Sequence, residues 1–283
     1  MFVDDPKSLV STKWLAEHLN DPNLRVLDAS RNRDDFTLDA RAEFEVAHIP
    51  NARYFDIDDV ADHRSDLPHM APPVEKFLSR VRAMGVGDGH QVVVYDSAGL
   101  FSAARVWWLF RLMGHETIAV LDGGLPKWQA DGYPVTDIAP IIRDRHMYAY
   151  FQPHLVKDVT QVAAASKLGD FQIVDARSAG RFYGTEPETR EGLRSGHIPI
   201  SKNVHYDSLL NTDGTMKDNA KLKAVFAAAG VDLNKPVIAT CGSGVTANIV
   251  TLALTRLGHT DHSIYDGSWC EWGMPSDLKV VKE

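Results

Sequence analysis

Cys241 is the residue of this sequence whose neighbours best suit nucleophilic chemistry. An apolar run at 236–240 precedes it, and a helical pattern begins at about 246. The intervening turn reads Gly242-Ser243-Gly244-Val245-Thr246. Two glycines in so short a turn let successive backbone N–H groups point inward and form an anion nest at a helix N-terminus. Because such a field favours a thiolate, the reactive form of cysteine, the segment predicts a nucleophile held by its own loop.

The second cysteine, Cys270, has no such surroundings. It lies between Trp269 and Glu271 without a neighbouring glycine turn, so we expect it to pack as a small apolar side chain. Two cysteines are too few for a disulfide framework or a four-sulfur metal site. The sequence also lacks HExxH, Cys-x-x-Cys and strand-to-helix GxGxxG motifs, so it predicts neither a metal nor a cofactor.

The chain repeats itself at an offset of about 145 residues. Four segments match in order: VLDAS at 26–30 with IVDAR at 173–177, AHIP at 47–50 with GHIP at 196–199, VVVYD at 92–96 with VIATC at 237–241, and 112–128 with 256–272. The repeat places Asp96 at the position of Cys241, in a loop at 96–102 that is one residue longer. A carboxylate cannot accept sulfur, so the first copy is predicted to be catalytically inactive.

Each copy alternates short β-branched runs with helical patterns, which is typical of βαβ units. We therefore predict an α/β protein of two three-layer domains, each with a central, mainly parallel sheet flanked by helices. Ser11 and Asp158 are predicted to cap helices that run to Leu19 and Leu168. The predicted domains span 8–133 and 154–281, and the proline-containing segment 134–153 is the predicted linker.

Charge and hydropathy exclude several classes of partner. The formal net charge of -8 argues against nucleic acid or an anionic membrane as the main partner. No run approaches the roughly 18 apolar residues of a membrane-spanning helix. The N-terminal stretch carries acidic residues and lacks a basic segment followed by an apolar one, so the sequence predicts a cytoplasmic protein.

The segment CGSGVTA at 241–247 resembles the active-site loop of the 3-mercaptopyruvate sulfurtransferases, tandem-domain members of the rhodanese superfamily. The resemblance covers nearly the whole chain and implies two rhodanese-like domains, the second one catalytic. It implies an enzyme that moves sulfur from 3-mercaptopyruvate through a persulfide on Cys241 and releases pyruvate. The implied acceptor is a thiol, such as that of thioredoxin, or cyanide. Gly242, Ser243, Gly244, Val245 and Thr246 would bind the transferred group.

The same resemblance assigns two cations to the donor. The segment GRFYGTEPETREG at 180–192 resembles the substrate-binding segment of these enzymes, in which Arg181 and Arg190 fall on the arginines that hold carboxylate and carbonyl. A guanidinium holds such planar oxygens in bidentate fashion, better than an ammonium does.

Three further residues match a relay proposed in relatives, namely Asp56, His69 and Ser243. A hydrogen-bonded acid, imidazole and hydroxyl could polarise the donor or carry protons. The alternative is that His69 caps a loop and that Ser243 satisfies loop amides.

Other functions remain open at this point. Thiosulfate sulfurtransferases share the fold but typically carry basic residues just after the cysteine, where this chain has Gly242 and Ser243. A cysteine-dependent phosphatase needs an arginine that closes the loop, and Ala247 stands there. A persulfide carrier without turnover of its own is the third alternative.

Overall fold

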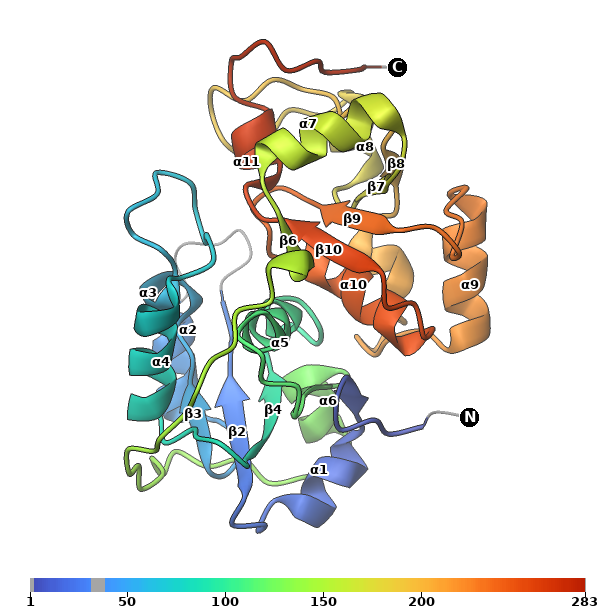
Figure 1. Ribbon diagram of the computed structural model, residues 1–283. Coiled ribbons are helices and arrows are strands. Elements are labelled where there is room, and N and C mark those ends of the chain that lie inside the picture. Colours follow the sequence, from blue (N-terminus) through green and yellow to red (C-terminus); the bar gives the residue numbers. More distant parts are fainter. Residues whose placement is uncertain (1–2, 32–38, 283) are drawn as a thin grey trace. The chain divides into compact units, whose positions relative to one another are not determined.

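The structure is a computed structural model that describes residues 3–31 and 39–282 (Figure 1). The chain forms two compact units. The first comprises Met1–Asp62, Ala71–Gln152 and Leu210–Met216. The second comprises His63–Met70, Pro153–Leu209 and Lys217–Glu283. The segment His63–Met70, from the first copy of the repeat, therefore groups with the second unit. The segment Leu210–Met216, from the second copy, groups with the first unit.

The first unit is built on a five-stranded sheet with the order β1-β5-β4-β2-β3, in which every pairing is parallel. Its strands are β1 (Leu9–Val10), β2 (Leu24–Asp28), β3 (Ala52–Tyr54), β4 (Gln91–Tyr95) and β5 (Ile118–Leu121). Its helices are α1 (Thr12–His18), α2 (Ala40–Val46), α3 (Ile57–Val60), α4 (Val74–Ala83), α5 (Ala103–Leu112) and α6 (Gly124–Ala130).

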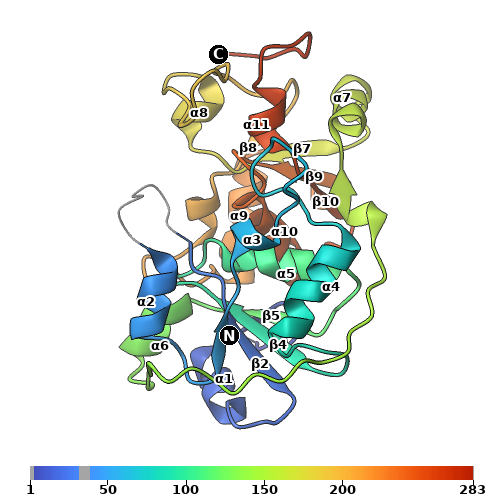
Figure 2. The same ribbon diagram turned by 90° about the vertical axis from the view of Figure 1, so that its left-hand side faces the viewer.

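Helices cover both faces of this sheet. Leu15 of α1 and Trp128 of α6 join the buried core under one face, and Phe44 of α2 packs against it. On the other face, Phe110 of α5 packs edge-on against Phe77 of α4. Figure 2 shows the sheet between α2 and α6 on one side and α4 on the other.

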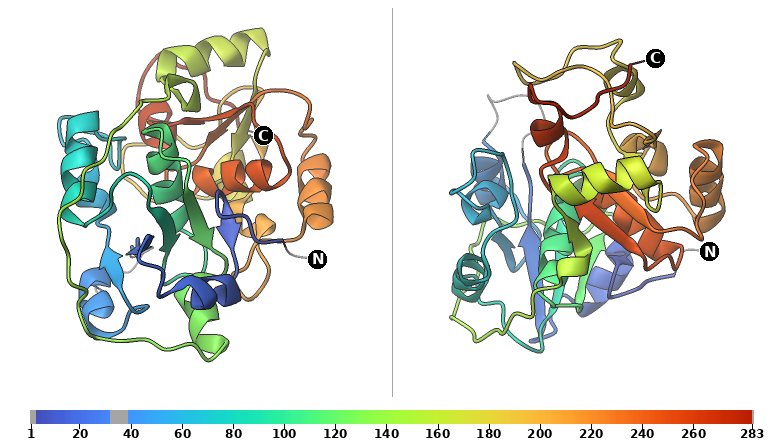
Figure 3. Two further views of the ribbon diagram at one scale, coloured as in Figure 1. Left: turned by 60° about the horizontal axis from the view of Figure 1, so that its bottom comes forward. Right: turned by 45° about the horizontal axis from the view of Figure 1, so that its top comes forward.

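The second unit repeats this plan with the strand order β6-β10-β9-β7-β8, again parallel throughout. Its strands are β6 (Val156–Lys157), β7 (Gln172–Asp175), β8 (Lys202–Asn203), β9 (Val237–Thr240) and β10 (His262–Tyr265). Its helices are η1 (Pro153–Leu155), α7 (Val159–Leu168), α8 (Ala179–Tyr183), η2 (Tyr206–Leu209), α9 (Asn219–Ala228), α10 (Ala247–Arg256) and α11 (Ser268–Trp272). Val162 of α7 and Trp269 of α11 pack on Ile238 of β9. Figure 3 shows α7, in yellow-green, beside the orange and red strands of this sheet.

The predicted fold class is confirmed, because both units are parallel sheets between helices. The capping predictions also hold. The Ser11 hydroxyl accepts from the Trp14 N–H at 3.1 Å, and the Asp158 carboxylate accepts from the Gln161 N–H at 2.8 Å in a reciprocal capping box. Helix α7 ends at Leu168 as expected, whereas α1 ends at His18, one residue before Leu19.

The segment 137–152 forms neither helix nor strand and lies along the first unit. The His146 carbonyl accepts from the Asp88 N–H at 2.9 Å, and the Tyr150 N–H donates to the Met113 carbonyl at 2.9 Å. A side chain at Gly87 would come within 2.5 Å of the His146 carbonyl oxygen, so glycine is required where the segment crosses. In the part of the chain that the structure describes, no helix combines the length and apolar character needed to cross a membrane.

Candidate active site

Cys241 follows the last residue of β9 and lies ahead of α10, with only 2% of its surface exposed. Helix α11 holds it in place through backbone contacts. The Trp269 N–H donates to the Cys241 carbonyl at 3.0 Å, and the Cys270 N–H donates to the Gly242 carbonyl at 2.8 Å. The predicted strand–turn–helix setting of the nucleophile is therefore present.

The turn after Cys241 has its carbonyls tied down. The Asn248 side-chain amide donates to the carbonyls of Gly244 at 2.6 Å and Val245 at 2.9 Å. In a trans peptide the next N–H points opposite to the carbonyl, so the amides of Val245 and Thr246 face away from Asn248. Gly244 supplies the left-handed conformation that the turn requires, with φ of 75°. The Thr246 hydroxyl accepts no capping hydrogen bond from the backbone N–H groups of α10, so the residue at the N-cap does not cover this helix N-terminus.

The corresponding loop of the first unit shows what such a nest holds. The buried Asp96 carboxylate accepts from the backbone N–H groups of Ala98 at 2.9 Å, Phe101 at 2.8 Å and Ala103 at 2.9 Å. The chain's own anion thus occupies the amides that converge at the start of α5. This geometry supports the prediction that the first copy is inactive, because its nest is filled by a group that cannot carry sulfur.

Ser268 is a residue of the site that sequence reasoning missed. Its hydroxyl donates to the Tyr265 carbonyl at 2.8 Å and accepts from the Cys241 N–H at 3.2 Å. It has φ of 50°, and its counterpart in the first unit, Gly124, has φ of 56°. A β-carbon at Gly124 would lie 2.3 Å from the Asp96 carbonyl oxygen and 2.6 Å from that of Gly99, so the path of the first loop excludes a side chain there. The repeat could have indicated this residue, because it reads DGG at 122–124 in one copy and DGS at 266–268 in the other.

Arg181, on α8, lies beside the Cys241 loop. A β-carbon added to Gly242 would lie 3.1 Å from its Nη2 atom. Its Nε and Nη2 donate to the Glu188 carboxylate at 3.0 Å and 2.6 Å. Glu188 therefore fixes the guanidinium beside the loop.

Glu188 also belongs to a buried ion network that the sequence analysis did not identify. Its side chain is 2% exposed and accepts from Arg177 Nη1 at 2.6 Å. Arg177 pairs with Asp175 at 2.5 Å and lies 4.0 Å above the Trp269 ring. Burial opposes the charge of Arg177, but Asp175 and Glu188 outweigh that cost and raise its pKa. The network links the end of β7 to Arg181.

Arg190 is exposed, and within the described residues it forms no ion pair. Its positive charge acts on the Cys270 thiol. Burial raises the pKa of the Cys270 thiol, and the charges of Arg190 and Arg181 offset part of that rise. Cys270 is thus a buried, protonated thiol, in keeping with a packing role.

The three residues of the predicted relay fall in different settings. Asp56, in the first unit, caps α3 by accepting from the N–H groups of Asp58 at 2.9 Å and Asp59 at 3.0 Å. His69 is buried, has φ of 61° and belongs to the second unit, which also holds Ser243 in the loop. The relay therefore stays a prediction.

Comparison with known proteins also finds one domain repeated twice along the chain. The model of the Rhodanese-like domain matches residues 11–131 and 158–274. The chain is 42% identical over 299 residues to thiosulfate/3-mercaptopyruvate sulfurtransferase 1, mitochondrial, of Arabidopsis thaliana, covering 98% of this chain and 79% of that protein. It is 42% identical over 274 residues to 3-mercaptopyruvate sulfurtransferase of Escherichia coli K12, covering 96% of each.

Among solved structures, SseA from Escherichia coli, described as a 3-mercaptopyruvate sulfotransferase of the rhodanese fold, superposes with a TM-score of 0.86. It is 40% identical and covers 92% of this chain and 98% of its own. A strand-to-helix loop with a buried cysteine, two domain matches and relatives at this identity agree with one another. The chain belongs to the rhodanese family and carries its domain twice.

Proposed function

We propose that this protein transfers sulfur from 3-mercaptopyruvate to a thiol or to cyanide through a persulfide on Cys241, with release of pyruvate. The observation that carries the proposal is the Cys241 loop, whose amides face away from Asn248 and whose edge is bordered by the Arg181 guanidinium. Relatives named for this reaction match nearly the whole chain, which supports the same assignment.

The chemistry balances in two steps. The Cys241 thiolate attacks the donor sulfur, the carbon–sulfur bond breaks, and its electrons leave on the enolate of pyruvate, which is then protonated. The acceptor thiolate or cyanide next attacks the outer sulfur of the persulfide and releases the Cys241 thiolate. Loop amides and the N-terminus of α10 stabilise the anionic sulfur in both steps.

Arg181 and Arg190 are proposed to hold the oxo-acid end of the donor. Glu188 occupies only Nε and Nη2 of Arg181, which leaves further N–H donors of this guanidinium for an incoming carboxylate. Arg190 is exposed, and its charge offsets part of the rise that burial causes in the pKa of Cys270. Cys270 follows Trp269, whose ring packs on the Arg177 guanidinium. Arg181 thus lies beside Gly242, and Arg190 acts on Cys270, whose N–H donates to the Gly242 carbonyl.

Replacing either Arg181 or Arg190 by alanine is expected to lower kcat/KM for 3-mercaptopyruvate by about ten- to a hundredfold. The physical reason is the loss of a charge-assisted contact worth roughly 1.5–3 kcal/mol. The measurement is pyruvate formation with a saturating thiol acceptor. Lys223→Ala, which removes an exposed cation on α9, is the matched control and should keep full activity. A variant that retains wild-type efficiency removes that arginine from the donor site.

The main alternative donor is thiosulfate, for which the Arabidopsis relative is also named. Thiosulfate is a compact dianion without a carboxylate for Arg181 and Arg190, so cations beside the cysteine must meet its charge. The loop of this chain offers amides and the Ser243 hydroxyl instead. We therefore favour 3-mercaptopyruvate.

Ser243→Lys is expected to raise the ratio of thiosulfate to 3-mercaptopyruvate turnover by about tenfold, because a cation about 4 Å from the reacting sulfur attracts a dianion even when screened. This substitution is cleaner than one at Gly242, where a β-carbon already meets Arg181. Steady-state rates with both donors give the ratio. The Ser243→Ala variant separates the effect of the added charge on this ratio from the effect of losing the hydroxyl. An unchanged ratio in a folded lysine variant would show that loop charge does not set donor choice.

A persulfide carrier without turnover is separated from an enzyme by one measurement. The enzyme forms many equivalents of pyruvate per equivalent of protein when a thiol acceptor is present, whereas a carrier forms one. Comparing thioredoxin, a small thiol and cyanide under the same conditions ranks the proposed acceptors. The cytoplasmic location also stays a prediction, which cell fractionation tests.

A further inference from the structure

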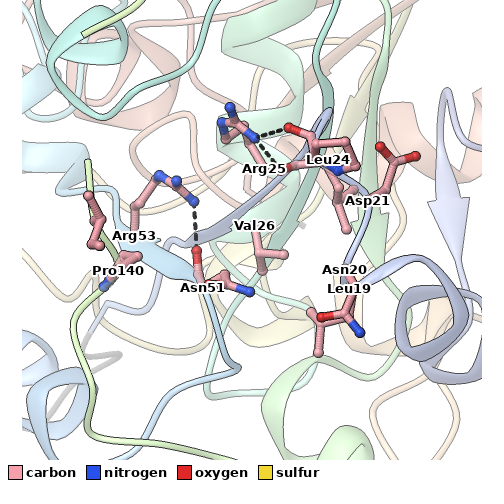
Figure 4. Close-up of a pocket in the computed structure, with 11 residues that line it drawn as sticks. Leu19, Asn20, Asp21, Leu24, Arg25, Val26, Asn51, Arg53 and Pro140 are labelled. Atoms are coloured by element: carbon pink, nitrogen blue, oxygen red, sulfur yellow. Dashed lines mark hydrogen bonds between the residues drawn. The ribbon is translucent and has the colours of Figure 1, made fainter. Parts of the chain in front are cut away.

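The first unit contains a cavity of about 340 Å³ beside β2 and β3 (Figure 4). Its lining comprises Leu19, Asn20, Asp21, Pro22, Leu24, Arg25, Val26, Asn51, Arg53, Pro140 and Ile141. The cavity lies where β2 and β3 begin, whereas the Asp96 loop follows the end of β4. Because the strands are parallel, cavity and loop lie at opposite ends of the sheet. The cavity is therefore distinct from the position that carries the nucleophile in the repeated domain.

Two arginines come together in this cavity because of strand register. Arg53 of β3 is aligned with Leu27 of β2, and side chains two apart on a strand share a face. Arg25 and Arg53 therefore leave the same face of the sheet on adjacent strands. Arg53 is 9% exposed, and burial with the charge of Arg25 lowers its pKa to about 10. Two positive charges are thus held close together, with Arg53 buried and Arg25 partly buried.

Only neutral groups compensate these charges. Arg25 donates to the carbonyls of Gly85 at 2.9 Å, Pro22 at 2.8 Å and Leu24 at 2.7 Å. Arg53 Nη1 donates to the Asn51 carbonyl at 2.6 Å, and Figure 4 shows this contact. Within residues 3–31 and 39–282, neither arginine has a carboxylate partner, and the buried Nε of Arg53 has no acceptor.

The acidic residue in the lining does not neutralise the pair. Asp21 is exposed, and its carboxylate accepts from the Asn23 N–H at 2.8 Å. In Figure 4 this carboxylate points away from Arg53. The excess of positive charge extends further, because burial and the charges of Arg25, Arg145 and Arg53 lower the pKa of the nearby His90 to about 4. A buried, unpaired guanidinium is costly unless an anion joins it.

We infer that this cavity is a binding site for the oxyanion group, phosphate or carboxylate, of a small molecule. Arg25 and Arg53 present guanidinium N–H groups, which match the planar or tetrahedral oxygens of such anions. Asn20 and Asn51 add amide groups, and Val26, Pro140 and Ile141 supply apolar walls. The volume is at the lower end of ligand cavities, so it suits inorganic phosphate or an acid of few carbons. The inference does not depend on the proposed sulfur transfer.

The test uses nitrogen-15-labelled full-length protein titrated with inorganic phosphate, and separately with acetate, at an ionic strength held constant with chloride. The readouts are the Nε–Hε resonances of Arg25 and Arg53 and the backbone amide of Asn51. A site-resolved readout is needed because the Cys241 loop of the second unit also attracts anions. We expect saturable shifts of all three groups, and the stronger of the two anions identifies the preferred oxyanion.

Arg53→Met should weaken the response of Arg25 by about tenfold or more, because it removes one of two charge-assisted contacts. Arg41→Met, which removes an exposed arginine paired with Glu45 on α2, is the matched control and should leave the response unchanged. If the methionine variant is poorly folded, Ile141→Trp fills the cavity from a residue that is 87% exposed and should also abolish the shifts. Resonances that stay still with both anions into the tens of millimolar, or equal shifts in wild type and the Arg53 variant, overturn the proposal. Because the readout is not activity, its failure is separate from failure of the sulfur-transfer proposal.

Discussion

One equivalent of 3-mercaptopyruvate is expected to add about 32 Da, the mass of one sulfur atom, to the peptide that contains Cys241 and nothing to the peptide that contains Cys270. Cys241 lies in a glycine-containing turn between β9 and α10, which is the setting of the proposed nucleophile. Burial raises the pKa of Cys270, so that thiol stays protonated and unreactive. Mass spectrometry of the digested, unreduced protein measures both peptides together.

Cys241→Ser should abolish turnover, a loss of at least about a thousandfold, because an alcohol neither attacks the donor sulfur nor forms a persulfide. Cys270→Ser is the matched control. It keeps the backbone N–H that holds the Gly242 carbonyl, so turnover should remain close to that of the wild type. Substantial pyruvate formation by the Cys241 variant, or sulfur on Cys270, would contradict the mechanism.

Arg177→Met is expected to destabilise the second unit by about 3–5 kcal/mol, because it leaves the carboxylates of Asp175 and Glu188 buried without their shared cation. Hydrogen exchange of the β7 and β9 amides measures the free energy of unfolding of that unit separately from the first. Activity should fall too, since Glu188 then loses one of the two arginines that position it beside the loop.

Arg80→Met is the control for this effect. Arg80 also forms a two-bond pair with a carboxylate, that of Asp59, at 2.6 Å and 2.9 Å, but both side chains are about two-fifths exposed. Solvent screens such a pair, so its loss should destabilise the protein far less than the loss of Arg177 does. If the two variants are destabilised equally, burial of the Arg177 network contributes nothing special, and Glu188 must be held by other contacts.

Local sequence was sufficient for the fold class and for the strand–turn–helix setting of Cys241, whose role as the nucleophile stays a prediction. Strand and helix patterns arise from residues close together in the chain, and the caps at Ser11 and Asp158 need only the first turn of their helices. The Cys241 loop follows the same rule, because a nest is made by consecutive peptides. The repeat then indicated two copies of one parallel sheet, and both sheets have the same strand order.

The sequence analysis assigned Arg181 to the site through resemblance, but it could not foresee what holds that arginine. Glu188 lies in an irregular segment where no period marks a buried charge, and it pairs with Arg177 eleven positions earlier. Asp56 illustrates the reverse case, because its observed contacts are those of a helix cap, and its predicted part in a relay depends on residues of the other unit.

The sequence alone determined that Cys241 is a cysteine in an amide-lined turn and that the chain is a duplicated α/β protein, because both properties depend on neighbouring residues. Only the tertiary structure decided that Ser268 contacts the Cys241 N–H, because the space for its side chain depends on the path of a separate loop. The pairing of Arg25 with Arg53 was decided in the same way. These residues are 28 positions apart, and only the register of β2 against β3 places both guanidinium groups in one cavity.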